Sequence, residues 1–181
     1  MIKSLERIKF KRIRSESSLS ERECVTGNVE NYISTLDKKK WINKFFAIYW
    51  PLEDEVDLRG LRKKYPLALP KCNSKKRLDF YIWDEAPLVK DQEGIFAPNN
   101  TNLLNPRQIS HIFVPCLSVD KKLNRLGYGG GYYDKLRSNE DWKLIPCIGV
   151  LTNKCLSKNL LTKDIWDIPL SGFITNNELL I

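Results

Sequence analysis

A run of glycines near the middle of the chain is the feature that most constrains how this backbone can fold. Four of the nine glycines lie between Gly127 and Gly131, within the segment RLGYGGGYYD at 125–134. Glycine adopts positive φ at little steric cost and lets a ligand approach the backbone closely. A helix is expected to follow at 132–137, so the run would gather backbone N–H groups at the positive end of that helix. The sequence therefore predicts a phosphate-binding loop.

Apolar runs separated by helical patterns indicate a mostly parallel sheet. Because such strands would be buried on both faces, the pattern favours a three-layer α/β/α domain whose ligands bind beyond the carboxyl ends of the strands. Strands are expected at 45–50, 66–70, 78–83, 112–115, 146–151 and 172–175.

Helices are expected on either side of the first of these strands. One is predicted at 21–36, where Ser20 and Glu23 have the spacing of a capping box, and the basic segment before it is predicted to be helical too. A short helix is expected at 57–64, and the stretch 84–108, with three prolines and several asparagines, is typical of a loop.

Size and composition favour one soluble, intracellular domain over 1–181. No apolar run approaches the roughly 20 residues of a membrane helix. The N-terminus also lacks the apolar core of a signal peptide. Five cysteines without a CxxC spacing suggest reduced, mostly buried thiols rather than a zinc site or disulfides.

Basic residues are concentrated at the N-terminus of a chain whose net charge is +8. Residues 1–14 contain six lysines and arginines against a single acidic residue, Glu6. One interpretation is a solvated basic helix or a nucleic-acid-binding arm. The other, which the glycine run favours, is a set of cations that folds back onto bound phosphates.

Two common nucleotide-binding signatures do not fit the glycine run. A P-loop ends in Gly-Lys followed by Ser or Thr, and no such lysine closes this run. The dinucleotide fingerprint G-x-G-x-x-G needs glycine where this chain has Tyr132, and it follows a first strand, whereas this loop follows a late one.

The glycine run and the residues before it carry a resemblance to a known family. The segment FVPCLSVDKKLNRLGYGGGYYD at 113–134 resembles the signature of the 5-formyltetrahydrofolate cyclo-ligases, also called methenyltetrahydrofolate synthetases. In that family a strand is followed by an aspartate and then by R-L-G-x-G-G-G-Y-Y-D. Weaker similarity spans nearly the whole chain, with Glu55 in WPLEDEV, GIFAP at 94–98 and WDIPL at 166–170.

The resemblance implies a Rossmann-like fold of the CoA-transferase type and a reaction that uses ATP and Mg²⁺. The family cyclises 5-formyltetrahydrofolate to 5,10-methenyltetrahydrofolate through a phosphorylated formyl group and releases ADP and phosphate. It further implies a cytoplasmic monomer that binds ATP and a reduced folate, with or without a polyglutamate tail, and has no nucleic-acid or membrane partner. Because phosphoryl transfer depends on positioning and charge neutralisation, the lone histidine, His111, is expected to be structural.

Matching positions assign roles to residues of this chain. Arg125 and Tyr133 are expected to act in catalysis, and Asp134 and Asp167 to bind Mg²⁺ through their carboxylates. The folate is expected to contact Trp50, Glu55, Tyr132 and Tyr133, with Glu55 meeting the N–H donors of the pterin. ATP is expected to contact Lys3, Arg7, Arg125, Leu126, Gly127, Tyr128, Gly129, Gly130, Gly131, Tyr132 and Tyr133.

Some of these assignments have alternatives. The spacing from the N-terminal cations to the next helix is longer than is typical of the family, so Lys9 or Lys11 could replace Lys3 or Arg7. Asp134 could instead serve the dipole of its own helix, and Trp50 could belong to the core.

The function also has alternatives. The chain departs from the family pattern at Leu123, usually glycine, at Ala97, often glutamate, and at Ser171, often aspartate. These changes leave room for a silent member that binds ATP or folate in a regulatory role. A nucleic-acid-binding module is a further alternative, although the basic segment lacks interleaved aromatic residues.

Overall fold

A seven-stranded sheet in the order β12-β11-β9-β6-β1-β2-β3 forms the centre of the molecule. The computed structural model describes residues 2–74, 77–99 and 102–181. Strands β11, β9, β6, β1 and β2 run parallel, whereas the edge strands β3 and β12 are antiparallel to their neighbours. The predicted mostly parallel sheet is therefore confirmed. Its strands are β1 (Phe45–Ala47), β2 (Leu67–Cys72), β3 (Leu78–Ile82), β6 (Ile109–Pro115), β9 (Cys147–Val150), β11 (Gly172–Ile174) and β12 (Leu179–Leu180).

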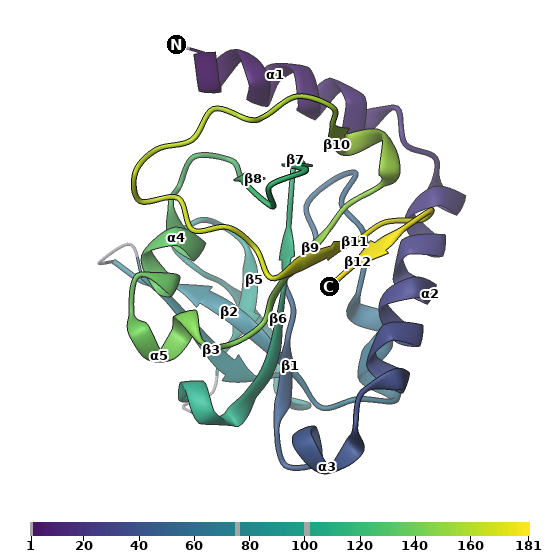
Figure 1. Ribbon diagram of the computed structural model, residues 1–181. Helices are drawn as coiled ribbons and strands as arrows, with labels where there is room; N and C mark the ends of the chain where they lie inside the picture. Colours follow the sequence, from purple (N-terminus) through teal and green to yellow (C-terminus); the bar gives the residue numbers. More distant parts are fainter. Residues whose placement is uncertain (1, 75–76, 100–101) are drawn as a thin grey trace.

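Helices cover both faces of this sheet. Helix α2 (Leu19–Thr35) lies on one face, and α4 (Tyr132–Arg137) and α5 (Glu140–Lys143) lie on the other (Figure 1). The central strand β6 shows why: Phe113 packs in the cluster that contains the apolar residues of α2, while Val114 packs in the cluster that contains Leu136 of α4. The strand is thus buried on both sides, as its uninterrupted apolar sequence predicted.

Helix α1 (Ile2–Ser15) crosses the molecule beyond the carboxyl ends of the parallel strands (Figure 1). It packs there on a small three-stranded sheet, β7 (Ser118–Asp120), β8 (Arg125–Leu126) and β10 (Leu156–Ser157). Phe10 of α1 is the buried anchor, in a cluster with Leu117 and Leu126. The basic N-terminal segment is therefore a helix of the domain and is held against the glycine-containing part of the chain.

The start of α2 differs from the prediction. The capping box is formed by Ser18 and Glu21, whose side chains each bond the other's backbone N–H, at 3.2 and 2.7 Å. Ser20 and Glu23 have the same spacing, so the sequence pattern fits both registers. The helix begins two residues earlier than expected, at Leu19.

The stretch 84–108, expected as loop, contains ordered structure. Strands β4 (Leu88–Lys90) and β5 (Phe96–Pro98) form an antiparallel hairpin, and a 3-10 turn, η2 (Pro106–Gln108), precedes β6. The Asp91 carboxylate accepts the N–H groups of Glu93 and Ile95, and this closes the hairpin turn. The prolines and asparagines of this stretch favoured a loop. In addition, each strand has only three residues, which is too short to show an alternating pattern.

Other boundaries moved by a few residues. Strand β1 ends at Ala47, before Trp50, and the helix expected at 57–64 is a 3-10 helix, η1 (Arg59–Lys63). Two short elements, α3 (Lys38–Trp41) and η3 (Asn153–Cys155), were not predicted. All five cysteines are free thiols, and all but Cys24 are buried, as expected. Within the described ranges no helix combines the length and the apolar character that crossing a membrane requires.

Candidate active site at the carboxyl edge of the sheet

A cavity of about 590 Å³ lies where β1 and β6 end. Trp50 follows β1, Pro115 ends β6, and both line this cavity. Its wall also includes the glycine loop, residues of α1, the turn of the β4–β5 hairpin and the segment around Asp167. The carboxyl ends of parallel strands are where ligands bind in open α/β sheets, so this position agrees with the expectation from sequence.

The glycine loop (127–131) has the backbone that its sequence predicted. Gly129 has φ +104° and Gly131 has φ +70°, both in the region that favours glycine. Gly131 is also the N-cap of α4, whose bounds, Tyr132–Arg137, are those expected. A Cβ at Gly130 would lie 2.8 Å from the ring of Tyr132, so a larger residue would displace that ring. A Cβ at Gly127 would likewise lie 2.8 Å from the guanidinium of Arg125, so a side chain at either position would displace a neighbour that lines the cavity.

Arg125 is held beside this loop by three neighbours. Its guanidinium donates to the carbonyl of Pro115 at 3.3 Å, pairs with Asp134 at 3.4 Å and lies over the ring of Tyr133, 5.2 Å from the centroid. Only 10% of the side chain is exposed. A rigid, largely buried guanidinium at a cavity wall is suited to bind an anion with its planar fork.

The two tyrosines after the loop differ in their surroundings. Burial of its hydroxyl raises the pKa of Tyr133, so this group stays protonated at neutral pH. The hydroxyl of Tyr132 donates to the carboxylate of Glu93, and this bond raises the pKa of Tyr132 to about 12. Tyr132 thereby links α4 to the hairpin turn, and Tyr133 can act in the cavity as a hydrogen-bond donor but not as a base.

Helix α1 brings two cations to the cavity. Lys3 pairs with Asp164 at 2.8 Å and with Asp167 at 2.5 Å, and the Nε of Arg7 donates to the carbonyl of Gly127 at 3.0 Å. Lys9 and Lys11 lie instead over the rings of Phe10 and Tyr128, and in the described part of the chain neither lines the cavity. The structure thus brings Lys3 and Arg7, one helical turn apart, to the cavity, and not the alternative pair.

The buried carboxylate of Glu55 lies beside the carboxyl end of α1, whereas Lys3 lies at the other end of that helix. Only 4% of its side chain is exposed. One oxygen accepts from the hydroxyl of Tyr128 and from Arg14 at 3.4 Å, and the other accepts the N–H of Leu52 at 2.8 Å. Burial raises the pKa of Glu55 to about 7, while the Leu52 N–H and the Arg14 charge act in the opposite direction. Sequence reasoning placed Glu55 in the site but missed Arg14, which lies 41 positions away and has no local signature.

The two carboxylates expected to bind Mg²⁺ both line the cavity, and each faces a cation: Asp134 faces Arg125, and Asp167 faces Lys3. Among the described residues no group of three or more His, Cys, Asp or Glu side chains could hold a metal ion. Mg²⁺ is commonly bound by one or two carboxylates that are completed by substrate phosphates and water. The donor set therefore fits Mg²⁺ when it arrives together with a phosphate-bearing ligand.

The aspartate of the sequence signature, Asp120, has a structural task. Its carboxylate accepts from the amide and the N–H of Asn124 and from the N–H groups of Lys122 and Leu161. Burial opposes the charge, but these bonds outweigh burial and lower the pKa of Asp120. These hydrogen bonds fix the turn that leads into Arg125, and Leu123 within this turn has φ +62°. Glycine adopts that conformation with less strain than leucine does.

The other departures and His111 lie away from the cavity. Ala97 is buried in β5, and the Ser171 hydroxyl accepts the N–H of Cys147. His111 is hydrogen-bonded to Tyr32 and Ser110, and burial, with a smaller effect of nearby Lys44, lowers its pKa to about 4. In the described ranges none of the three lines the cavity.

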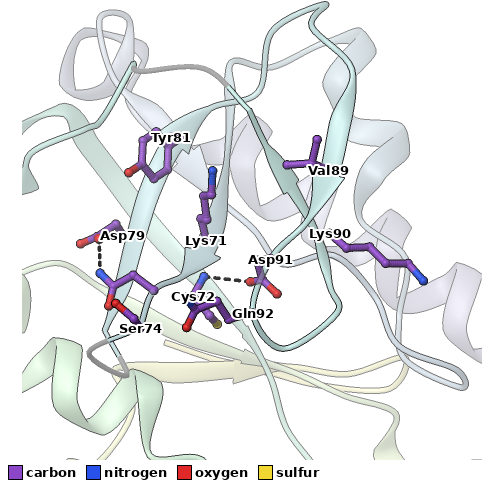
Figure 2. Close-up of a pocket in the computed structure, with 10 residues that line it drawn as sticks. Lys71, Cys72, Ser74, Asp79, Tyr81, Val89, Lys90, Asp91 and Gln92 are labelled. Carbon is purple, nitrogen blue, oxygen red and sulfur yellow. Dashed lines mark hydrogen bonds between the residues drawn. The ribbon is translucent and has the colours of Figure 1, made fainter.

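A side hollow of about 400 Å³ adjoins the cavity next to the β4–β5 hairpin (Figure 2). Cys72 and Asp91 line both spaces, and the Asp91 carboxylate accepts the N–H of Cys72 at 2.8 Å. Burial raises the pKa of Cys72 to about 12, so the thiol is not a nucleophile near neutral pH. The hydrogen bond between Cys72 and Asp91 holds the hairpin turn at the edge of the cavity.

Comparisons with known proteins agree with this architecture. The sequence profile of the 5-formyltetrahydrofolate cyclo-ligase family matches residues 3–175. The 5-formyltetrahydrofolate cyclo-ligase of Haemophilus influenzae is 26% identical over 175 residues, which cover 91% of this chain and 92% of that protein. The protein of the same name from Mycoplasma genitalium is 34% identical over 134 residues, 74% of this chain and 73% of its own.

A solved structure is similar over almost the whole chain. The NMR structure of Aquifex aeolicus 5,10-methenyltetrahydrofolate synthetase superposes with a TM-score of 0.80 at 30% identity and covers 99% of this chain and 92% of that one. The profile match and this similarity together confirm the family that the glycine signature indicated. The chain belongs to the 5-formyltetrahydrofolate cyclo-ligase family.

Proposed function

We propose that this protein catalyses the ATP- and Mg²⁺-dependent cyclisation of 5-formyltetrahydrofolate to 5,10-methenyltetrahydrofolate. Family membership supports the reaction class. The observation that carries the residue assignment is that one cavity is lined both by the glycine loop with Lys3 and Arg7 and by the buried Glu55 with Trp50. Phosphate-binding groups and a carboxylate beside an aromatic wall thus face the same space, as a reaction between a nucleotide and a pterin requires.

The chemistry explains why such a site needs cations and backbone donors. A formamide carbon is a poor electrophile, and its oxygen is a poor leaving group. In the proposed reaction the formyl oxygen attacks the γ-phosphorus of ATP, and ADP leaves. The neighbouring folate amine then attacks the formyl carbon and loses its proton, and phosphate departs. Each stage moves charge among phosphate oxygens, and fixed donors stabilise that charge.

The nucleotide half of the site is assigned to the glycine loop and its cations. Backbone N–H groups of 127–131 would approach the phosphates closely, because glycines carry no side chain of their own that would keep a ligand away from the backbone. Arg125 would bind a phosphate with its planar fork, and Lys3 and Arg7 would add charge from α1. Tyr133, held protonated by burial, would donate to the developing phosphate.

The folate half is assigned to Glu55 and the aromatic residues. An ionised carboxylate has about four acceptor sites. Three donors of the protein contact Glu55, and the remaining site would accept an N–H of the pterin. Trp50 would provide a flat wall for the ring system.

Asp134 and Asp167 would hold Mg²⁺ together with phosphate oxygens. The ion would supply positive charge next to the transferred phosphoryl group. Because all of these residues belong to one chain and one fold, we expect a monomer with a single domain to be active. We further expect the protein to be cytoplasmic and to accept folates with or without a polyglutamate tail.

The proposal is tested by mixing the purified protein with Mg²⁺-ATP and 5-formyltetrahydrofolate. The near-ultraviolet absorbance of the methenyl product should grow, and ADP should form only when the folate is present. Leu123→Gly and Ser171→Asp, which restore the usual family residues outside the cavity, should leave turnover unchanged. ATP binding without product or ADP would instead support the silent, regulatory alternative. A large gain of activity in either variant would show that the departures limit this chain.

A further inference from the structure

The largely buried guanidinium of Arg14 reaches Glu55 from the last turn of α1. It lies 3.4 Å from one carboxylate oxygen, and only 14% of the Arg14 side chain is exposed. The hydroxyl of Tyr128 donates to the same oxygen. Two side chains from distant parts of the sequence thus converge on one atom of the carboxylate that the proposed function assigns to the folate.

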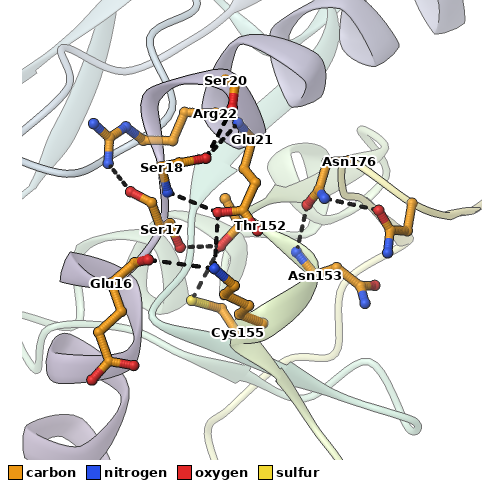
Figure 3. Close-up of polar contacts among 12 residues, drawn as sticks. Glu16, Ser17, Ser18, Ser20, Glu21, Arg22, Thr152, Asn153, Cys155 and Asn176 are labelled. Atoms are coloured by element: carbon orange, nitrogen blue, oxygen red, sulfur yellow. Dashed lines mark hydrogen bonds and ion pairs between the residues drawn. The ribbon is translucent and has the colours of Figure 1, made fainter.

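Arg14 is fixed independently of Glu55. Its guanidinium also donates to the carbonyl of Glu53 at 3.1 Å and lies over the ring of Tyr128, 5.3 Å from the centroid. The carboxyl end of α1 is held as well: the hydroxyls of Ser17 and Thr152 are 2.7 Å apart, and Figure 3 shows this contact where α1 turns into α2. The position of the Arg14 charge is therefore set by the fold rather than by the carboxylate.

This ion pair is poorly explained by stability alone. Burying two charges carries a desolvation cost that their attraction often only balances. In the described part of the chain, the Nε of Arg14 is also buried without a hydrogen-bond partner. Arg14 does have an electrostatic effect on its partner: its charge acts to lower the pKa of Glu55, against the larger effect of burial.

We propose that Arg14 is a positioning residue for substrate recognition, which pairs with the buried Glu55 carboxylate and, together with Tyr128, directs it at the cavity. This inference rests on the proposed function. It adds a second role for α1, whose first turns bring Lys3 and Arg7 to the cavity while Arg14 in its last turn orients the carboxylate that would bind the folate.

The kinetic test compares Arg14→Met with Arg12→Met, a control on the same helix whose side chain is 85% exposed. Losing a charge-assisted contact at pH 7 should raise the KM for 5-formyltetrahydrofolate by about 10-fold or more. The KM for ATP should stay within about 3-fold, and Arg12→Met should change neither. Arg14→Lys, which keeps the charge without the fork, should restore part of the affinity for the folate.

The pH profile separates this role from a purely structural one. In Arg14→Met the rise of kcat/KM for the folate with pH should move to more alkaline pH, because Glu55 loses the charge that favours its ionised form. Burial raises the pKa values of Tyr49, Cys116 and Tyr133, the titratable groups near Glu55 in this part of the cavity wall, so these groups do not titrate near neutrality. The charged neighbour of Glu55 is Arg14, and the closest donor is the hydroxyl of Tyr128.

A measurement on the ligand-free protein separates failure of this inference from failure of the proposed function. The carboxyl carbon of Glu55 can be followed by ¹³C NMR, with Glu55→Gln to assign the signal. Its titration midpoint should move to higher pH in Arg14→Met and should move less in Arg14→Lys, which keeps the charge. An unchanged midpoint, an unchanged KM for the folate, or an equal loss for folate and ATP would overturn the inference, even if the wild-type protein is an active cyclo-ligase.

Discussion

Glu55→Gln should make the protein less sensitive to rising pH while it weakens the folate site. Burial raises the pKa of Glu55 to about 7 from an ordinary value of 4.5. A group whose pKa is higher in the folded state binds its proton more tightly there. The stability it contributes is complete below pH 4.5 and is lost as the pH rises through about 7.

The magnitude follows from the two pKa values. Each tenfold change in a protonation equilibrium is worth about 1.4 kcal/mol, so ionising Glu55 costs the folded state up to about 3 kcal/mol. No reduction for solvent screening is needed, because only 4% of the side chain is exposed. Glutamine has nearly the same shape but does not ionise, so this cost disappears in the variant.

The assay is urea unfolding of both proteins at pH 4, 5, 6, 7 and 8, followed by tryptophan fluorescence. The quantity to examine is the free energy of unfolding of the wild type minus that of Glu55→Gln at each pH. Static effects of the substitution, such as the Arg14 charge left without its partner, shift this difference by a constant and do not change its slope. The difference should fall by up to about 3 kcal/mol between pH 4.5 and pH 8. A flat difference would refute the reasoning, because it would mean that the Leu52 N–H and the Arg14 charge cancel the effect of burial. A difference that rises with pH would refute it too, because these contacts would then outweigh burial.

Three further outcomes are expected. Arg125→Ala should raise the KM for ATP or lower kcat by at least about 10-fold, since charge-assisted contacts are worth about 1.5–3 kcal/mol; unchanged steady-state kinetics would remove Arg125 from the site. Gly131→Val should lower the thermal midpoint more than Gly131→Asn, because the φ of +70° suits asparagine better than a β-branched residue; equal losses would show that the backbone relaxes there. His111→Phe should flatten the loss of stability on the acid side, because a group whose pKa is lowered from 6.5 to about 4 gives stability that is lost as the pH falls through that window; identical acid curves would contradict it.

The local signals in the sequence located the elements that carry the chemistry. The bounds of α4 were predicted by the change from a glycine run to a helical pattern at Tyr132, and six strands of the central sheet were located from their apolar runs. The short strands β4, β5, β7, β8, β10 and β12 were not predicted. These features depend on the intrinsic preferences of neighbouring residues, which act in any context. For the same reason the positive φ of Gly129 and Gly131 could be expected from the glycine run alone.

Local signals could not choose between equivalent registers. Two Ser-x-x-Glu patterns overlap before α2, and the chain uses the one that begins at Ser18. Lys3 and Arg7 face the cavity, rather than Lys9 and Lys11, because Phe10 packs into the core and so fixes the rotation of α1. Propensity is equal for the alternatives in each case, so packing of the whole domain decides.

Local patterns in the sequence could not predict which distant segments pair with each other. The hairpin of β4 and β5 consists of strands too short to show a period, and cross-strand bonds and packing against the rest of the sheet stabilise it. Arg14 and Glu55 are separated by 41 positions, and nothing next to either residue marks the other. The chain by itself determined which residue types are available and where the backbone must bend. Only the tertiary structure decided which charges share a buried space, because the desolvation and pairing that set their protonation arise when distant segments pack together.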